Sequence, residues 1–477
     1  MSEHTFLWHD YETFGANTRR DRPAQFAAIR TDADLNEIGD PVMLYCQPAP
    51  DFLPEPQACL ITGITPQHCL AHGVPENQFA RRINQEFSQS GTIGVGYNTI
   101  RFDDEITRFM LWRNLLDPYA REWQNRCGRW DILDMVRTTY ALRPDGITWP
   151  TNDQGRVSFK LEMLAKANGI AHESAHDALS DVRATIALAR LIKRLQPKLF
   201  DFCLSLHKKD QVIAEFGLPD RRPVLHVTGM IPVEQGCLCM VMPLATHPFN
   251  KNELITWNLE HDPRELLGLD VATIRRRLFS KTDALQDGEQ RLPVKSIHLN
   301  KSPVVIRNLK TLTAERAAHW GLSVDQALHH AEYALALPNM DAMWELVYQR
   351  ETADTVDVDQ DLYNGFVGNN DRRLLQSLAE SSAEKLARAT PQFQDERLGE
   401  LVFRYRARNF PDSLTDAEAA RWENLRAERF FGGDAAALTV DAFFAEIDRL
   451  SDNATESDQE ILAALYDYAE QIVPQHV

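Results

Sequence analysis

Long hydrophobic runs are absent from this sequence. No stretch of about 20 apolar residues occurs among its 477 positions, so we expect no transmembrane helix and no membrane partner. The residues from Met1 to Thr5 have neither the basic start nor the apolar core of a secretory signal. Both absences favour a cytoplasmic protein.

Cysteine is scarce and scattered. The chain has seven cysteines, and no two of them form the C-x-x-C pair that is typical of a structural zinc site. We interpret them as reduced thiols that pack inside a cytoplasmic protein. They are Cys46, Cys59, Cys69, Cys127, Cys203, Cys237 and Cys239.

Positive charge is also in short supply. The chain has 51 Lys and Arg against 69 Asp and Glu, for a net charge of −18. Since phosphates repel carboxylates, a nucleic acid could be held only by a local basic tract. Such a tract runs from Arg291 to Lys310, where Lys295, Lys301 and Arg307 lie between the two ends and no acidic residue occurs. The alternative is a solvated strand face.

Length and texture predict three domains, since an ordinary domain has roughly 150 residues. Residues 1–196 alternate strand and helix patterns, which indicates an α/β fold. Residues 197–350 contain short β-type runs separated by Gly, Pro and Asn, which indicates a small β-rich domain. The expected helices of the first part are Asp104–Leu115, Ile132–Tyr140, Leu161–Asn168 and Ala178–Leu195.

Residues 351–477 have helical patterns. The stretch Glu351–Asp361 carries five acidic residues and no basic one, and we interpret it as a linker. Thr415 and Glu418 have the spacing of a capping box at a helix start. An apolar stripe at helical spacing predicts another packed helix; it consists of Leu462, Leu465, Ala469 and Ile472.

The run from Trp8 to Gly15 contains the first candidate for chemistry. Residues two apart in a strand point to the same face, so Asp10 and Glu12 present adjacent carboxylates. Such carboxylates repel each other unless they are protonated or neutralised by a cation, and hard oxygen ligands favour Mg²⁺ or Mn²⁺. The D-x-E pattern alone is weak, because it recurs at polar positions elsewhere. Its place at the end of an apolar strand, where α/β sheets build their sites, strengthens it.

Two further segments add acidic residues. An apolar strand ends at Asn98 and leads into a helix opened by Asp103 and Asp104; helix capping alone would also explain these acids. Farther along, Asp181 lies about one turn inside a helix, and His176 lies on the approach to it. A histidine with an ordinary pKa of about 6.5 suits a general base, although a lone surface histidine is the alternative.

Taken together, these segments resemble the DnaQ-like family of 3′→5′ exonucleases, in its His-containing branch. That family has D-x-E, then a distant Asp, then H-x4-D, which Asp10, Glu12, Asp103, His176 and Asp181 match; the third match leaves Asp103 and Asp104 open. The resemblance implies that the four carboxylates hold two Mg²⁺ ions about 4 Å apart, with Mn²⁺ able to substitute, and that His176 is the base.

The likeness extends to the bacterial exodeoxyribonuclease I family. It is carried by the runs His9–Gly15, Asp21–Arg30, Leu362–Phe366 and Arg404–Pro411, together with Pro293–Lys295 and His298–Lys301. It implies a ribonuclease H-like exonuclease domain with a mixed central sheet, then an SH3-like β-rich domain, then an all-α C-terminal domain. It also implies processive digestion of single-stranded DNA to 5′-mononucleotides, in DNA repair or recombination, by a monomer.

The same resemblance implies contact residues. Where the family has Ser-Phe-Arg-Leu-Glu, this chain has Lys160, which keeps the charge and loses the bidentate fork. Expected substrate contacts are Glu12, Thr13, Phe14, Asn98, Lys160, Lys295, Lys301 and Arg307, with Phe14, Trp112 or Trp130 stacking on bases unless they belong to the core. The acidic tail of single-stranded-DNA-binding protein would dock on Arg404, Arg406, Arg408, Arg421 and Arg426, although solvated helix faces would explain some of these.

The alternatives are a related exoribonuclease or proofreading exonuclease, and a non-catalytic nucleic-acid-binding scaffold. The two domains beyond the first count against the former. All five motif residues are present, which counts against the latter.

Overall fold

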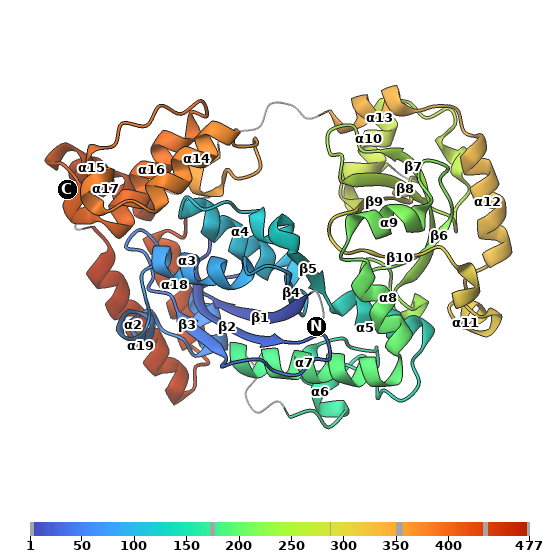
Figure 1. Cartoon of the computed structure of the whole chain (residues 1–477), viewed down its shortest axis with the longest axis horizontal. Coiled ribbons are helices and arrows are strands. Elements are labelled where there is room, and N and C mark those ends of the chain that lie inside the picture. The colour runs from blue at the N-terminus through green and yellow to red at the C-terminus, as the bar shows by residue number, and fades with distance from the viewer. Residues whose placement is uncertain (1–3, 172–176, 287, 350–355, 433–436, 475–477) are drawn as a thin grey trace. The chain divides into compact units, whose positions relative to one another are not determined.

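The computed structural model describes residues 4–171, 177–286, 288–349, 356–432 and 437–474 (Figure 1). The chain forms two compact units, the first made of residues 1–128, 172–186 and 353–477, the second of residues 129–171 and 187–352. Across the described ranges, no helix has the length and apolar character needed to cross a membrane. The predicted domain boundaries at residues 196 and 350 stay a prediction, because the two compact units divide the chain at other positions.

A mixed sheet has four of its five strands in the first unit. Its strand order is β3-β2-β1-β4-β5. β1 pairs antiparallel with β2 and parallel with β4, as the prediction of a mixed sheet requires. The bounds are β1 Thr5–Thr13, β2 Pro23–Thr31, β3 Val42–Tyr45, β4 Thr92–Gly96 and β5 Gly128–Asp131. β1 is central because its apolar side chains are buried on both faces, Leu7 and Tyr11 on one and Phe6 and Trp8 on the other.

Two helices cover the Leu7 and Tyr11 face of this sheet. α3 (Glu76–Phe87) contributes Phe79 and Ile83 to the core on that face, and α4 (Asp103–Arg113) contributes Ile106 and Met110. The short helices α1 (Pro56–Thr62) and α2 (Pro66–His72) precede them. α7 (Ala178–Leu195) starts beside β2, where the Ala178 N–H donates to Gln25 Oε1 at 3.3 Å.

The C-terminal part of the first unit is helical. Its helices are α14 (Asn369–Ala379), α15 (Ala383–Arg388), α16 (Arg397–Asn409), α17 (Asp416–Phe431), α18 (Val440–Ser451) and α19 (Glu456–Ile472). The capping box of Thr415 and Glu418 is present. Leu462, Leu465 and Ala469 are buried in one core with residues of α1, α2 and α18. The predicted capping box and apolar stripe are therefore confirmed.

The interpretation of Glu351–Asp361 as a linker is wrong for its described part. Val358–Gln360 forms a 3-10 turn, and Asp359 is 3% exposed. Its carboxylate accepts hydrogen bonds from Arg404 at 3.2 Å and Arg429 at 2.6 Å. Asp357 and Asp359, in the described part of this stretch, pair with arginines that lie far along the chain, and sequence composition does not reveal such partners.

The second unit contains an antiparallel sheet with the order β10-β6-β7-β8-β9. The strands are β6 Val224–Val227, β7 Leu238–Thr246, β8 Glu253–Asn258, β9 Val294–His298 and β10 Val304–Ile306. Its helices are α5 (Leu133–Leu142), α6 (Leu161–Ala167), α8 (Pro197–Ser205), α9 (Lys209–Phe216), α10 (Val271–Phe279), α11 (Ala314–His319), α12 (Val324–Ala336) and α13 (Asp341–Tyr348). The predicted β-rich texture is confirmed.

Candidate active site

Three carboxylates from two elements meet at the end of β1. One oxygen each of Asp10, Glu12 and Asp181 lies within 4.8 Å of the other two. Strand alternation places Asp10 and Glu12 on the same face of β1, and Asp181 lies in the first turn of α7. About 170 positions separate Asp181 from Asp10 and Glu12 in the sequence, and the fold brings the three carboxylates together.

Asp103 belongs to the same cluster. It is the first residue of α4 and 3% exposed, and its Oδ1 accepts the Tyr11 N–H at 3.1 Å, between Asp10 and Glu12 along β1. Asp104 has a different partner: its carboxylate lies 2.6 Å from the guanidinium of Arg121 in a buried ion pair. The geometry therefore favours Asp103 as the fourth carboxylate.

The start of α7 adds a carboxylate that the sequence patterns did not single out. Asp177 Oδ2 accepts the Ser180 N–H at 3.1 Å and so caps the helix. Its charge also acts on Asp10 and Glu12. An Asp directly before a helix gives the capping signal in the sequence, but its closeness to β1 depends on the fold. His176, the predicted base, lies outside the described residues.

The carboxylates raise one another's pKa. Burial raises the pKa of Glu12 from its ordinary 4.5 to about 8, with further contributions from Asp181, Asp103 and Asp177. Burial, followed by the charges of Asp103, Glu12 and Asp181, raises the pKa of Asp10 well above 3.8. Such a cluster is stable in its ionised form only beside a positive charge. Carboxylate oxygens that converge in a partly buried site are suitable ligands for a hard divalent cation.

Two predicted contact residues next to Glu12 point away from solvent. Thr13 is 8% exposed, and its Oγ1 donates to the Gly15 carbonyl at 2.7 Å. Phe14 is 1% exposed and lies in an apolar core with Phe52. The prediction that Phe14 stacks on a base is therefore wrong for this structure, because its ring already packs against the helices around it.

The two predicted stacking tryptophans are core residues as well. Trp112 is 2% exposed and its indole N–H donates to the Val358 carbonyl at 2.8 Å. Trp130 is 1% exposed and packs edge-on against Phe200. Neither ring can stack on a base unless the core opens, so this prediction is also corrected.

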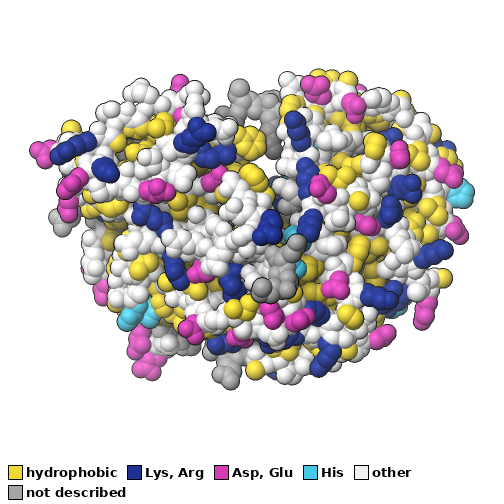
Figure 2. All heavy atoms as spheres, viewed as in Figure 1, with side chains coloured by type: hydrophobic (Ala, Val, Ile, Leu, Met, Phe, Trp, Pro, Cys, Tyr) yellow, Lys and Arg dark blue, Asp and Glu magenta, His cyan; other side chains and the backbone are white. Residues whose placement is uncertain are grey.

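The remaining predicted contacts lie on or near the surface. Asn98 has a positive φ of 65° and directly precedes the 3-10 turn Thr99–Arg101 that follows β4. In the second unit, Lys160 is exposed and lies 3.7 Å from Glu162, Lys295 and Lys301 are half-buried, and Arg307 is exposed. Acidic and basic side chains are interspersed on the face shown in Figure 2.

Three of the five arginines predicted to dock a partner are buried in ion pairs. Arg408 lies 2.8 Å from Asp51, Arg404 lies 2.8 Å from Asp357, and Arg406 pairs with Glu418. Each of the three has a side chain no more than 10% exposed. The prediction that they offer charge to an acidic tail is corrected, because carboxylates of the chain already neutralise them. Arg421 is 57% exposed while also pairing with Glu400, and Arg426 is mostly buried beside Glu423.

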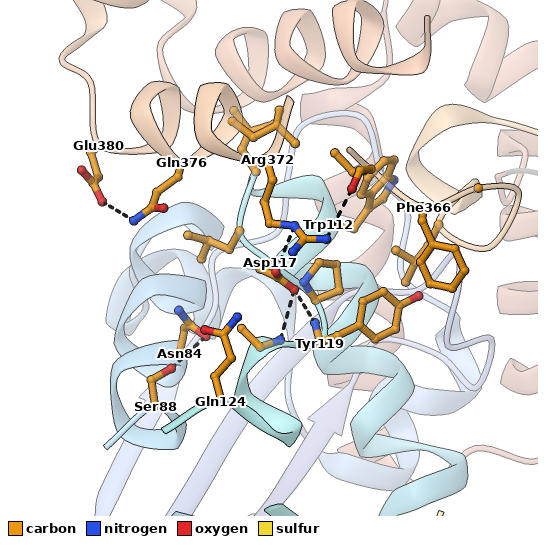
Figure 3. A pocket seen from close by; sticks show the side chains of 18 residues that line it. Asn84, Ser88, Trp112, Asp117, Tyr119, Gln124, Phe366, Arg372, Gln376 and Glu380 are labelled. Carbon is orange, nitrogen blue, oxygen red and sulfur yellow. Dashed lines mark hydrogen bonds and ion pairs between the residues drawn. The ribbon is translucent and has the colours of Figure 1, made fainter. Parts of the chain in front are cut away.

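Exposed aromatic side chains lie where the sequence patterns did not place them. Phe366 is 92% exposed, Trp123 64% and Tyr363 44%. Phe366 borders a cavity of about 320 Å³ with Tyr119 and Arg372, and Figure 3 shows Arg372 directed toward Asp117. The Tyr363 hydroxyl accepts from Arg108 of α4 at 3.1 Å. Tyr363 and Phe366 belong to a run that carries the family resemblance, but the sequence alone does not separate exposed from buried rings.

Three family models match the chain, in the same order as the three predicted domains. The family model described as Exonuclease matches residues 7–189, Exonuclease I SH3-like domain matches 207–350, and Exonuclease I C-terminal domain matches 356–472. The chain is 43% identical over 473 residues to exodeoxyribonuclease I of Escherichia coli strain K12, covering 98% of each chain.

Two solved structures are similar over nearly the whole chain. Exonuclease I from Methylocaldum szegediense has a TM-score of 0.93 and 45% identity, covering 99% of this chain and all of that one. The zinc-ion-bound form of the E. coli exonuclease I complex with single-stranded DNA has a TM-score of 0.92 and 42% identity, covering 99% of this chain and all of that one.

An exonuclease domain with clustered carboxylates, followed by an SH3-like and a helical domain, defines a hydrolase of the exonuclease class, whose members use divalent metal ions. The chain belongs to the exonuclease I family.

Proposed function

We propose that this protein is a Mg²⁺-dependent exonuclease that removes 5′-mononucleotides from the 3′ end of single-stranded DNA, processively and in DNA repair or recombination. The observation that carries the proposal is the meeting of Asp10, Glu12 and Asp181 within 4.8 Å, beside Asp103, in an exonuclease domain. A relative 42% identical over almost the whole chain was solved with single-stranded DNA, which supports this substrate class.

Four carboxylates would hold the metal ions: Asp10, Glu12, Asp103 and Asp181. When bound, a pair of Mg²⁺ ions supplies activation of water and stabilisation of the departing 3′ oxygen. The chain provides rigid positions, because Asp10 and Glu12 lie on a central strand and Asp103 and Asp181 lie in the first turns of helices. The Tyr11 N–H fixes one oxygen of Asp103.

The substrate assay separates the proposed function from its alternatives. End-labelled single-stranded DNA, double-stranded DNA and RNA are incubated with and without Mg²⁺, and the products are resolved by length. We expect Mg²⁺-dependent loss of 3′ nucleotides from single-stranded DNA alone. Preferential trimming of RNA would favour the exoribonuclease alternative, and binding without cleavage would favour the scaffold.

Replacing His176 with alanine is expected to lower kcat by about 10²- to 10⁴-fold, the range of a general base. Binding of single-stranded DNA should change little, because the phosphate-binding charges are retained. Single-turnover rates and fluorescence anisotropy measure the two quantities separately. A variant with full turnover would remove His176 from the role of proton acceptor.

Basic residues of the second unit are proposed to follow the DNA backbone. The combined variant Lys295→Gln, Lys301→Gln, Arg307→Gln should lower the slope of log Kd against log salt concentration by about two, at roughly 0.7 per lost phosphate contact on a single strand. Lys251→Gln, at an exposed position between β7 and β8, is the control. An unchanged slope in the combined variant would exclude the three residues from the DNA path.

Phe366 is proposed to stack on a base, since its ring is 92% exposed beside the cavity of Figure 3. Phe366→Ala should weaken single-stranded DNA binding by about 1–3 kcal/mol, the range for one base–aromatic stack. The exposed Phe249 of the second unit gives a matched control, Phe249→Ala. Equal affinities for both variants and the parent protein, measured by anisotropy, would contradict the stacking role.

We infer that the remaining partner charge comes from Arg421, with Arg426 contributing less, and that the acidic tail of single-stranded-DNA-binding protein is the partner of a monomer in the cytoplasm. All seven cysteines are free and buried, which suits a reducing compartment. Anisotropy of a labelled acidic tail peptide tests the contact. Undiminished binding to Arg421→Glu would refute it.

A further inference from the structure

A buried ion pair lies directly behind the start of α4. Arg121 donates through Nη2 to Asp104 Oδ1 at 2.6 Å, and the two side chains are 0% and 2% exposed. The guanidinium carbon lies 4.5 Å from the centre of the Phe87 ring, so the cation is also held by the face of an aromatic side chain. Nε and Nη1 of Arg121 have no hydrogen-bond partner among the described residues. Asp104 therefore provides the principal fixed contact of this guanidinium.

The neighbouring strands leave room for this cation. Gly94 of β4 pairs with Leu7 of β1. A β carbon at position 94 would lie 2.9 Å from the Phe87 ring and 3.7 Å from Arg121 Nη1. A larger residue would displace the ring on which the guanidinium rests. The absence of a side chain at Gly94 is thus part of the Arg121 site.

The ion pair and the Phe87 ring involve the chain neighbours of two candidate metal ligands, Asp103 and Asp10. Asp104 follows Asp103 in the chain. His9, which precedes Asp10, packs edge-on against the same Phe87 ring at 4.8 Å. Arg121 therefore binds the residue that follows one candidate ligand and shares its ring contact with the residue that precedes another.

The start of α4 needs such an anchor. Phe102 occupies the N-cap position with φ −126° and ψ −75°, and none of the described side chains caps the helix there. Three acidic residues, Asp103, Asp104 and Glu105, crowd the first turn. A buried tether to the second of them restricts rotation of this turn, and with it the direction of the Asp103 carboxylate.

We propose that Arg121 is a positioning residue that, through Asp104, holds the first turn of α4 so that the Asp103 carboxylate stays in the metal cluster. The inference rests on the proposed function, because it assumes that this cluster binds a divalent cation. Outer partners of metal ligands typically change metal affinity by about 10- to 100-fold when they are removed.

The opposite end of the same helix offers a matched control. Arg113 is the last residue of α4, its side chain is 1% exposed, and it lies 2.8 Å from Glu76, which is 8% exposed. Arg113→Met and Arg121→Met each leave a buried carboxylate without its arginine. A general loss of helix stability would lower the thermal midpoint in both variants, whereas a positioning role of Arg121 would weaken metal binding in Arg121→Met alone.

The experiment measures Mn²⁺ binding by electron paramagnetic resonance in the parent protein and in Arg121→Met, Arg121→Lys and Arg113→Met, together with the thermal midpoint and the Mg²⁺ concentration for half-maximal rate. We expect Arg121→Met to weaken Mn²⁺ binding about 10-fold or more, Arg121→Lys to recover part of it, and Arg113→Met to retain parental affinity. Equal Mn²⁺ affinities in Arg121→Met and Arg113→Met would overturn the proposal.

If Arg121→Met does not fold, Arg121→Lys decides: parental Mn²⁺ affinity in that variant would overturn the role, and weakened affinity beside a parental Arg113→Met would support it. Failure of the proposed function is recognised separately, as a parent protein that does not degrade single-stranded DNA, whereas the Mn²⁺ comparison does not depend on turnover.

Discussion

Asp181→Asn is expected to reduce the rate of single-stranded DNA degradation by about 10³-fold, or ~4 kcal/mol of transition-state stabilisation, since a metal ligand contributes several kcal/mol. The amide has nearly the same shape but carries no charge, so the fold should be retained. Asp181 lies within 4.8 Å of Asp10 and Glu12 through their oxygens, and its loss leaves the cluster one anion short. Initial rates at saturating DNA measure the effect.

A matched substitution controls for changes at a helix start. Asp325→Asn alters an exposed residue in the first turn of α12, as Asp181 lies in the first turn of α7. Its rate should equal that of the parent protein. An Asp181→Asn variant with more than about a tenth of parental activity would contradict a ligand role, because a lost ligand costs several kcal/mol.

The same cluster predicts how Mg²⁺ stabilisation changes with pH. The pKa of Glu12 is raised from 4.5 to about 8 in the metal-free protein, chiefly by burial. A raised carboxylate pKa favours folding at low pH, and this contribution is lost as the pH rises from 4.5 toward 8. Cations compete with protons for these oxygens. The rise in thermal midpoint on adding Mg²⁺ should therefore be larger at pH 8 than at pH 6, and Asp181→Asn should reduce it.

Asp359→Asn is expected to lower the free energy of unfolding by about 3–5 kcal/mol, the cost of removing one partner from a buried ion pair. Asp359 lies 2.6 Å from Arg429 and 3.2 Å from Arg404, all three side chains being no more than 10% exposed. These pairs join the described end of the acidic run to α16 and α17. Urea unfolding followed by tryptophan fluorescence measures the change.

The control for Asp359→Asn is an exposed pair. Glu446→Gln breaks the contact with Arg449, whose side chain is 63% exposed. Surface pairs contribute about 0–1 kcal/mol, so this variant should unfold close to the parental urea midpoint. A loss at Asp359 no larger than that at Glu446 would show that the buried network does not stabilise the helical part.

This network also predicts sensitivity to acid. Burial alone would raise the pKa of Asp359, but the guanidinium groups of Arg408 and Arg429 hold it well below 3.8. A lowered carboxylate pKa stabilises the folded protein at pH values above the pKa of the unfolded state, which is 3.8 here. This stabilisation is lost as the pH falls below 3.8. Unfolding free energies of the parent protein should therefore fall below about pH 4 more steeply than those of Asp359→Asn.

Local patterns predicted the elements well and the exposure of side chains poorly. The spacing of Asp10 and Glu12 in a strand and of Asp181 in a helix was sufficient to suggest a cation site, because alternation and helical spacing act over a few residues. The choice between Asp103 and Asp104 was open, since both lie at the start of the same helix. It depended on Arg121, which lies 17 positions away from Asp104 in the chain.

The arginines and aromatics show why the rest could not be predicted. Arg404 and Phe366 have the same intrinsic chemistry whether they face solvent or the core. Arg404 is buried against Asp357 and Asp359, whereas Phe366 is 92% exposed. The partners of Arg404 lie more than 40 positions away in the chain, and a local sequence pattern does not specify such contacts.

The sequence by itself determined the β1 carboxylate pair, the acidic helix starts, the β-rich middle and the helical end, because short-range periodicity and capping encode them. Only the tertiary structure decided that Asp103 binds the backbone of β1 next to Asp10 while Asp104 pairs with Arg121, and that Phe14, Trp112 and Trp130 are core residues. The physical reason is that desolvation and ion pairing depend on which groups lie close together in the folded protein. Groups that are distant in the sequence come close only through the tertiary fold.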